Sequence, residues 1–315
     1  MKAVLHFRAG GEFRRQLERV VPHWLRVHVV DERDTATFLA EMAEAQVLLH
    51  VLEPVTDAVM ASAPLLQLVQ KIGVGVNTID LEAARRRGIR VANMPGTNSR
   101  AVAEHTLALM LATLRRVVEL HQATIHGMSS DVSADFFDRV GEVAGRTIGL
   151  VGYGDVPRLL APVLVALGAR VIYASRTPKE CAFGERRTLD ELLAAADIVS
   201  LHVPAQPGMP PVLGADAIRQ MKPGSILINT ARGSLVDEIA LAKALREGHL
   251  RAAGLDVLAN EPARANDPLL ALANVVATPH IAWLTPETLV RSVAVAVENC
   301  RRLRDGDGLL HQVTV

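Results

Sequence analysis

The chain has 315 residues, half of them hydrophobic, which is enough apolar material for the cores of two ordinary domains. Lysine plus arginine and aspartate plus glutamate number 34 each, and this balance argues against the strongly basic surface of a nucleic-acid-binding protein. The two cysteines, Cys181 and Cys300, argue against a disulfide or zinc framework and favour a reducing compartment.

Residues 1–7 lack the long apolar region and the small-residue cleavage site of a signal peptide, and they are predicted to form a first strand. No uninterrupted apolar run approaches the ~20 residues that a helix needs to cross a bilayer. We therefore expect a soluble, cytoplasmic protein that binds neither membranes nor nucleic acid.

The first hundred residues alternate short β-rich runs with helical patterns, the latter including Glu12–Val20 and Leu81–Arg87. Because the connections are short, this alternation predicts a parallel sheet covered by helices on both faces. The predicted strands are Ala3–Phe7, Val27–Val30, Val47–Leu52, Leu65–Ile72 and Ile89–Ala92.

The segment Ser99–Val118 is predicted to be one long helix with most of its apolar residues on one face. Its length favours a helix that joins domains or packs across a subunit interface, and a core helix is the alternative. The apolar residues are Val102, Leu107, Leu111 and Leu114. His121–Gly145 has weak periodicity and is predicted to be an irregular connection.

A second series of strands and helices begins at Thr147 and ends with a predicted helix over Pro286–Leu303. Its strands are nearly continuous in Ile, Val, Leu and Ala, which is typical of strands buried on both faces. They are Thr147–Val151, Arg170–Ala174, Ile198–Val203, Ile226–Thr230, Ala253–Val257 and Val275–Thr278.

The run Ile148–Pro157 carries the first two glycines of a dinucleotide fingerprint. Gly152 permits the tight turn that leaves the strand, and Gly154 lets the backbone approach a pyrophosphate at the following helix N-terminus. Pro157 replaces the third glycine, which a first helical turn tolerates but which loses the close helix–strand contact. The alternative is an ordinary turn between strand and helix, and the flanking elements favour a cofactor site.

Three residues with catalytic chemistry follow predicted strands, where the ligands of parallel sheets bind. Arg232 offers a bidentate fork for a carboxylate or a keto oxygen. Glu261 and His280 would, if they meet, favour the charged imidazolium and raise the pKa of the histidine toward neutral pH. A surface arginine and an ordinary surface or core histidine are the alternatives.

Taken together, these residues resemble the D-isomer-specific 2-hydroxyacid dehydrogenase family, whose motifs occur here in the same order through most of the chain. The matching runs are Lys71–Asp80, Val91–Gly96, Ala101–Thr106, Gly152–Asp155, Asp197–Pro204, Met221–Gly224, Asn229–Asp237, Ala253–Pro262 and Thr278–Ile281.

The resemblance implies that Arg232, Glu261 and His280 are the catalytic residues of this family. Arg232 would hold the substrate carboxylate, and His280, tuned by Glu261, would exchange the hydroxyl proton, so no metal is needed. The amides of Val74, Gly75 and Val76 would grip the substrate carboxylate. The cofactor contacts of the family match Asp155, Val156, His202, Val203, Pro204, Thr230, Ala231 and Asp256, the last toward the carboxamide.

The resemblance also implies an α/β protein with two doubly wound parallel-sheet domains. A Rossmann cofactor domain, residues 99–283, would be inserted into a flavodoxin-like substrate domain, residues 1–98 and 284–315, and closure of the cleft would exclude water. The chain departs from the family at Pro157 and in residues 121–145, which lack the usual Gly-x-Trp pattern. Trp283, where many members carry small residues, would narrow the pocket or meet the ligand, with packing as the alternative.

The family resemblance predicts a homodimeric reductase for small 2-keto acids such as glyoxylate and hydroxypyruvate. Ser175, Arg176 and Thr177 follow a strand where NAD-specific sites usually carry an acid, so NADP is expected to be preferred over NAD. The alternative function is a dinucleotide-sensing, corepressor-like binding protein of the same fold, and turnover would distinguish the two.

Overall fold

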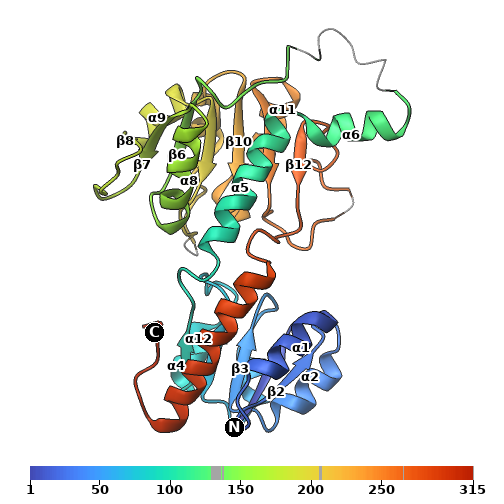
Figure 1. The fold of residues 1–315 in the computed structure, drawn as a ribbon, viewed down its shortest axis with the longest axis vertical. Helices are drawn as coiled ribbons and strands as arrows, with labels where there is room; N and C mark the ends of the chain where they lie inside the picture. The colour runs from blue at the N-terminus through green and yellow to red at the C-terminus, as the bar shows by residue number, and fades with distance from the viewer. Residues whose placement is uncertain (129–135, 137, 206–207, 265, 315) are drawn as a thin grey trace. The chain divides into compact units, whose positions relative to one another are not determined.

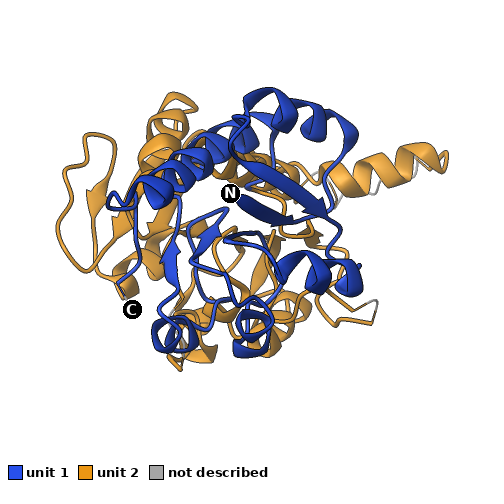
Figure 2. Cartoon of the chain, turned by 90° about the horizontal axis from the view of Figure 1, so that it is seen from below, with its two compact units in different colours: residues 1–98, 283–315 blue, residues 99–282 orange. Residues whose placement is uncertain are grey.

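The computed structural model describes residues 1–128, 136, 138–205, 208–264 and 266–314 (Figure 1). The chain divides into two compact units, unit 1 with residues 1–98 and 283–315 and unit 2 with residues 99–282 (Figure 2). Among the described residues, no helix has both the length and the apolar character that a membrane span requires.

Unit 1 is built on a five-stranded parallel sheet in the order β2-β1-β3-β4-β5. This order has the switch point of a flavodoxin-like sheet between β1 and β3. The strands are β1 (Lys2–His6), β2 (Arg26–Val30), β3 (Val47–His50), β4 (Leu68–Lys71) and β5 (Arg90–Ala92).

Helices cover both faces of this sheet, as its apolar strands require. One face packs against α2, α3 and α4 around Met42, Met60 and Ala83, and the other faces α1 and α12. The helices are α1 (Gly11–Val20), α2 (Thr35–Met42), α3 (Asp57–Ala61), α4 (Leu81–Arg86) and α12 (Pro286–Asp305).

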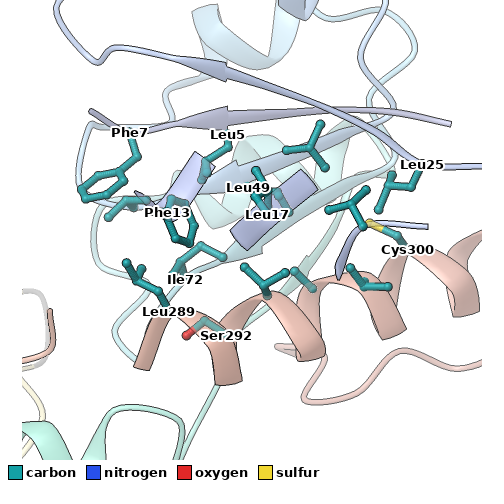
Figure 3. Close-up of a pocket in the computed structure, with 16 residues that line it drawn as sticks. Leu5, Phe7, Phe13, Leu17, Leu25, Leu49, Ile72, Leu289, Ser292 and Cys300 are labelled. Carbon is teal, nitrogen blue, oxygen red and sulfur yellow. The ribbon is translucent and has the colours of Figure 1, made fainter. Parts of the chain in front are cut away.

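A small cavity of about 20 Å³ lies between the sheet, α1 and α12 (Figure 3). Its walls are almost entirely apolar side chains, among them Leu5, Leu17, Leu49 and Leu289. A space of this size and polarity is a dry packing defect, because a buried water needs polar partners. Cys300 lies in its wall, where burial raises the pKa of the thiol to about 12 and keeps it unreactive.

Unit 2 is built on a seven-stranded parallel sheet in the order β12-β11-β10-β9-β6-β7-β8. The chain reverses direction across the sheet at β6, as in a Rossmann fold. The strands are β6 (Thr147–Val151), β7 (Arg170–Ala174), β8 (Glu185–Arg186), β9 (Ile198–Leu201), β10 (Ser225–Asn229), β11 (Leu250–Leu255) and β12 (Val275–Ala277).

The side chains of a central strand point alternately to the two faces of the sheet and pack in two different hydrophobic clusters. Ile148 and Leu150 of β6 pack with α5 and α8, whereas Val151 packs in the cluster of α9, α10 and α11. Each fully buried side chain of this size contributes roughly 1.5–3 kcal/mol. The helices are α5 (Ser99–Leu114), α6 (Val117–Ile125), α8 (Asp155–Ala166), α9 (Leu189–Ala195), α10 (Ala215–Gln220) and α11 (Glu238–Arg246), with a 3₁₀ turn, η2, at Gly233–Leu235.

The prediction of one long helix over Ser99–Val118 is wrong. Arg116 has a left-handed backbone, with φ 52°, and divides the segment into α5 and α6 (Figure 1). The prediction of an irregular connection from His121 is also wrong as far as Ile125, which α6 includes; residues 129–135 and 137 lie outside the described part of the chain. Helix α5 packs against α8 and buries Leu109, Met110 and Leu114, so it is a core helix of unit 2.

The prediction of two doubly wound parallel-sheet α/β domains is confirmed. The predicted strands are found at their places, two of them, β6 and β7, with the predicted bounds. Several others end earlier than predicted. The differences of one to three residues at strand ends are ordinary, because ladder hydrogen bonds stop where the chain turns away.

Candidate active site

The predicted cofactor and catalytic residues of unit 2 gather at one edge of its sheet. Because the strands are parallel, the loops that follow them leave from the same edge. These loops carry Gly152–Val156 after β6, Ser175–Thr177 after β7, His202–Pro204 after β9, Thr230–Arg232 after β10, Asp256 and Glu261 after β11, and His280 after β12.

Gly152 turns the chain sharply at the end of β6. Its φ is +99°, and its amide donates to the carbonyl of Ala174 at 2.8 Å. A Cβ at Gly152 would lie 2.5 Å from the backbone oxygen of His202. Both observations require glycine here for the fold itself, because β6 and β9 approach each other closely at this point.

Gly154 stands immediately before α8 and has a different reason to lack a side chain. Among the described residues, no atom lies within 4 Å of a Cβ built at Gly154, and no side chain caps the helix. An open space beside Gly154 and an uncapped helix start are features that an anion site at a helix N-terminus requires. Pro157 lies in the first turn of α8, where its missing N–H costs no helical bond.

The turn that carries Arg232 is held from both sides by Asn229. The Asn229 side chain accepts from the amide of Ala231 at 3.0 Å and donates to the carbonyl of Arg232 at 2.9 Å. Gly233 follows, and a Cβ there would collide with the backbone of Leu258 and Ala259. The loop after β11 thus packs directly against the turn after β10.

The Arg232 guanidinium donates to the carbonyl of Ala231 at 2.6 Å. Burial lowers the pKa of Arg232, and the negative charge of Glu261 opposes that shift. An arginine remains charged in such surroundings. The site therefore holds a half-buried guanidinium close enough to a carboxylate for their charges to interact.

His280 and Glu261 form a hydrogen-bonded pair. The Nδ1 atom of His280 lies 2.6 Å from Oε2 of Glu261, and the other carboxylate oxygen accepts from the amide of Leu258 at 3.0 Å. The two residues that sequence reasoning could only suppose to meet are thus in contact.

The carboxylate of Glu261 is ionised in this pair. Burial pushes the pKa of Glu261 upward, but the hydrogen bond and charge of His280 outweigh burial. The amide of Leu258 and the charge of Arg232 act in the same direction, and the resulting pKa lies below its ordinary value. An ionised Glu261 can only accept hydrogen bonds, so the proton between the two residues sits on Nδ1 of His280.

The side chains of Thr230 and Asp256 are engaged inside unit 2. The hydroxyl of Thr230 lies 2.8 Å from that of Thr106. The buried carboxylate of Asp256 accepts from the Thr278 hydroxyl at 2.6 Å and from the amides of Ile281 and Ala282, each at 2.9 Å. A carboxylate has about four lone-pair positions, and these bonds use three of those of Asp256.

The loop after β7 is basic and ordered by a residue that the sequence did not single out. The Arg186 guanidinium donates to the carbonyls of Ser175 and Arg176, at 3.0 and 3.3 Å, and the Ser175 hydroxyl donates to the Thr177 carbonyl at 2.6 Å. His202 follows β9 at the same edge of the sheet, and its Nε2 atom lies 2.9 Å from the Ser200 hydroxyl. Burial lowers the pKa of His202 to about 4.

The predicted substrate loop, Val74–Val76, follows β4 at the carboxyl edge of the unit 1 sheet. Asn93, which sequence reasoning missed, donates from its side chain to the carbonyl of Val74 at 2.8 Å, while its own amide donates to the carbonyl of His311 at 3.2 Å. Trp283 belongs to unit 1, where its ring lies 6.0 Å from that of Phe7. This is a packing contact between two aromatic rings within unit 1.

Within the described residues, no group of three or more His, Cys, Asp or Glu side chains is placed to hold a metal ion. The chemistry present is that of one acid–base pair, one guanidinium and one open helix N-terminus. Asn229 and Asn93 lie in runs that resemble the family, but no role was predicted for either, since asparagine is common in turns and its partners here are backbone atoms.

A family model described as D-isomer specific 2-hydroxyacid dehydrogenase, NAD binding domain, matches residues 107–282. D-3-phosphoglycerate dehydrogenase of Mycobacterium leprae is 39% identical over 299 residues, which cover 92% of this chain and 55% of the relative. The chain thus spans about half the length of that relative.

Glyoxylate reductase of Aeropyrum pernix is 40% identical over 271 residues, which cover 84% of this chain and 81% of the relative. Among solved structures, the TT0316 protein from Thermus thermophilus aligns over 100% of both chains, with a TM-score of 0.88 and 38% identity. The similarity therefore extends through both units.

Proposed function

Because this chain belongs to the D-isomer specific 2-hydroxyacid dehydrogenase family, we propose that it transfers a hydride between a nicotinamide cofactor and a small 2-keto or 2-hydroxy acid. Unit 2, which contains the match to the NAD binding domain, would be the cofactor domain, and unit 1 the substrate domain. The observation that carries the proposal is the contact of His280 with Glu261 beside the charge of Arg232.

The residues at the sheet edge suit the cofactor. The open space at Gly154 and the uncapped amides of α8 would receive a pyrophosphate, and Asp256 is proposed as a contact toward the carboxamide. When bound, a nicotinamide supplies or accepts the hydride. His202, Val203, Pro204, Thr230 and Ala231 follow β9 and β10 at the same edge and are proposed as further contacts, the buried Thr230 through its backbone.

His280 would move the proton that accompanies the hydride. Its Nδ1 proton is directed at Glu261, so the exchanged proton would be carried by Nε2. In reduction Nε2 would give its proton to the keto oxygen, and in oxidation it would take the hydroxyl proton. Arg232 would hold the carboxylate of the acid and polarise its carbonyl. The amides of Val74–Val76 are proposed as substrate contacts of unit 1.

We propose glyoxylate and hydroxypyruvate as the substrates, since a glyoxylate reductase matches 84% of this chain over 81% of its own length. The test follows the absorbance of NADPH and NADH with a panel of small 2-keto acids that includes phosphohydroxypyruvate. Turnover of glyoxylate or hydroxypyruvate supports the proposal. Cofactor binding without turnover of any keto acid would favour the dinucleotide-sensing alternative.

Replacing Glu261 by glutamine should move the pH profile of reduction. Reduction takes a proton from the imidazole, and the hydrogen bond and charge of His280 help to hold the pKa of Glu261 below its ordinary value, so an ionised carboxylate faces the imidazole. A neutral amide should let the rate fall at a pH lower by about one unit or more. The measurement is kcat against pH, with the exposed Glu247→Gln as control; an unmoved profile would speak against the pairing.

We propose that NADPH is preferred over NADH. Ser175, Arg176 and Thr177 leave β7 without an acid, and Arg186 lies against the same backbone. We expect kcat/KM to favour NADPH by ~10-fold or more, because a 2′-phosphate gains charge-assisted hydrogen bonds there. The double variant Ser175→Asp/Arg176→Ala should reverse the ratio.

The matched control for cofactor preference is Arg170→Ala, at the opposite end of the same strand, where Arg170 pairs with Glu185 at 2.9 Å. This variant should keep the wild-type ratio. A wild-type enzyme that favours NADH would refute the preference.

We also propose a homodimer formed through unit 2. Every described residue of α6 is at least partly exposed, Val117 and Ile125 among them, and α8 with its C-cap residue exposes the stripe Leu159, Val163 and Leu167. Such apolar surface is usually covered, here by a second copy. Sedimentation equilibrium should show a dimer at micromolar concentration, and Val163→Glu/Leu167→Glu a monomer, while Val290→Glu on α12 changes nothing. A monomeric wild type would refute the dimer.

The cytoplasmic location stays a prediction.

A further inference from the structure

The loop that carries His280 is wrapped around the carboxylate of Asp256. Residues 278–282 supply three donors to it: the Thr278 hydroxyl and the amides of Ile281 and Ala282. The amide of His280 itself donates to the backbone carbonyl of Asp256 at 2.8 Å. Asp256 is 1% exposed, so these bonds are made away from water and each is costly to lose.

His280 needs this support because its backbone is in a conformation that non-glycine residues avoid. Its φ is +55°, in the left-handed region, which is disfavoured for a residue with a Cβ atom. Such a conformation persists only where the surroundings impose it. It directs the imidazole to Glu261.

His105 reaches the same network from α5. Its Nε2 atom lies 2.9 Å from the Thr278 hydroxyl and 3.5 Å from Oδ1 of Asp256. The single hydroxyl proton of Thr278 is used on Asp256, so the hydroxyl accepts from His105. His105 therefore carries its proton on Nε2 and ties the loop to the core helix of unit 2.

We propose that His105 and Thr278 are positioning residues for the reaction, which act through Asp256 to hold His280 in the geometry needed for proton transfer. This inference rests on the proposed function, in which His280 is the acid–base residue. Neither His105 nor Thr278 has to touch the substrate for this role. The chain from α5 to the imidazole consists of the contacts His105–Thr278, Thr278–Asp256 and Asp256–His280.

The test compares variants that remove each contact with variants that retain it. Thr278→Val removes the hydroxyl at equal size, and Thr278→Ser keeps it. His105→Leu removes the donor, and His105→Gln places an amide N–H near the position of Nε2. Thr113→Val is the control, since within the described part of the chain that buried hydroxyl on α5 bonds only the carbonyls of Leu109 and Met110.

We expect Thr278→Val and His105→Leu to lower kcat by ~10-fold or more, as misplacement of a general acid should, while KM for the keto acid and Kd for the cofactor change by less than ~3-fold. Thr278→Ser and His105→Gln should recover most of the loss, and Thr113→Val should show none. The ¹⁵N resonances of the His280 ring should shift in the two disruptive variants alone.

Normal kcat in Thr278→Val and His105→Leu would overturn the inference, as would a loss that serine and glutamine do not restore. If Thr278→Val fails to fold, His105→Leu decides, because α5 is anchored by many other contacts. A wild type that reduces no keto acid would instead refute the proposed function, so the two failures are distinguishable.

Discussion

Replacing Arg232 or His280 by alanine is expected to lower kcat/KM for the keto acid by at least ~100-fold. His280→Ala removes the group that exchanges the proton, and its partner Glu261 cannot reach in its place because it lies behind Nδ1. Arg232→Ala removes the guanidinium that would orient the carboxylate and polarise the carbonyl.

The two variants should differ in which constant changes. Arg232→Ala should raise KM as well as lower kcat, whereas His280→Ala should act on kcat alone. Both should fold and bind the cofactor, since the Arg232 turn is held by Asn229 and not by its guanidinium. Arg246→Ala, exposed on α11, is the control, and near-normal turnover in either catalytic variant would remove that residue from the mechanism.

Replacement by alanine is expected to have different effects at two glycines of unit 2, on folding and activity at Gly233 and on cofactor binding at Gly154. Gly233→Ala drives a methyl group into the backbone of Leu258 and Ala259, so the loop that carries Glu261 must move. We expect a loss of about 2 kcal/mol or more in the free energy of unfolding and of at least ~100-fold in kcat. Gly154→Ala places its methyl group in open space, so folding should be unchanged.

For Gly154→Ala the expected effect is on the cofactor alone, with Kd raised ~10-fold or more, because the methyl group occupies the space that a pyrophosphate would use. Thermal unfolding with and without NADPH measures both effects. Gly214→Ala, before α10 and also in open space, is the control. Unchanged cofactor affinity in Gly154→Ala would place the pyrophosphate elsewhere.

The parallel sheets and the positions of the site residues could be predicted because they depend on local pattern. Runs such as Thr147–Val151 and Arg170–Ala174 are apolar over the length of one strand, and the residues after them necessarily reach the same edge. The break at Arg116 had no such signal, since residues 114–117 contain neither glycine nor proline. It is stabilised by tertiary contacts, including the Arg116 guanidinium 4.7 Å from the ring of Phe136.

The network around Asp256 also could not be predicted. His105 and Thr278 are separated by 173 positions and meet only because α5 packs beneath β12 and its neighbours. The sequence marked Asp256 as a cofactor contact because it matches the family there, but three of its acceptor positions serve the protein's own loop. The sequence pattern predicts which residues lie at the carboxyl edge of the sheet, but it does not predict which of them form hydrogen bonds with each other.

Unit 1 is assembled from both ends of the chain, and this has a consequence during synthesis. Helix α12 covers the sheet face that also holds α1, yet it is translated after all of unit 2. At about 5–20 residues per second, the ribosome needs roughly 10–40 s to make residues 99–282. During that interval Leu5, Leu49 and Ile72 on the nascent sheet have no α12 to cover them. Unit 2 can fold first, while unit 1 stays incomplete until α12 has been made. Chaperones would be needed in that interval, and a chain truncated before α12 would aggregate.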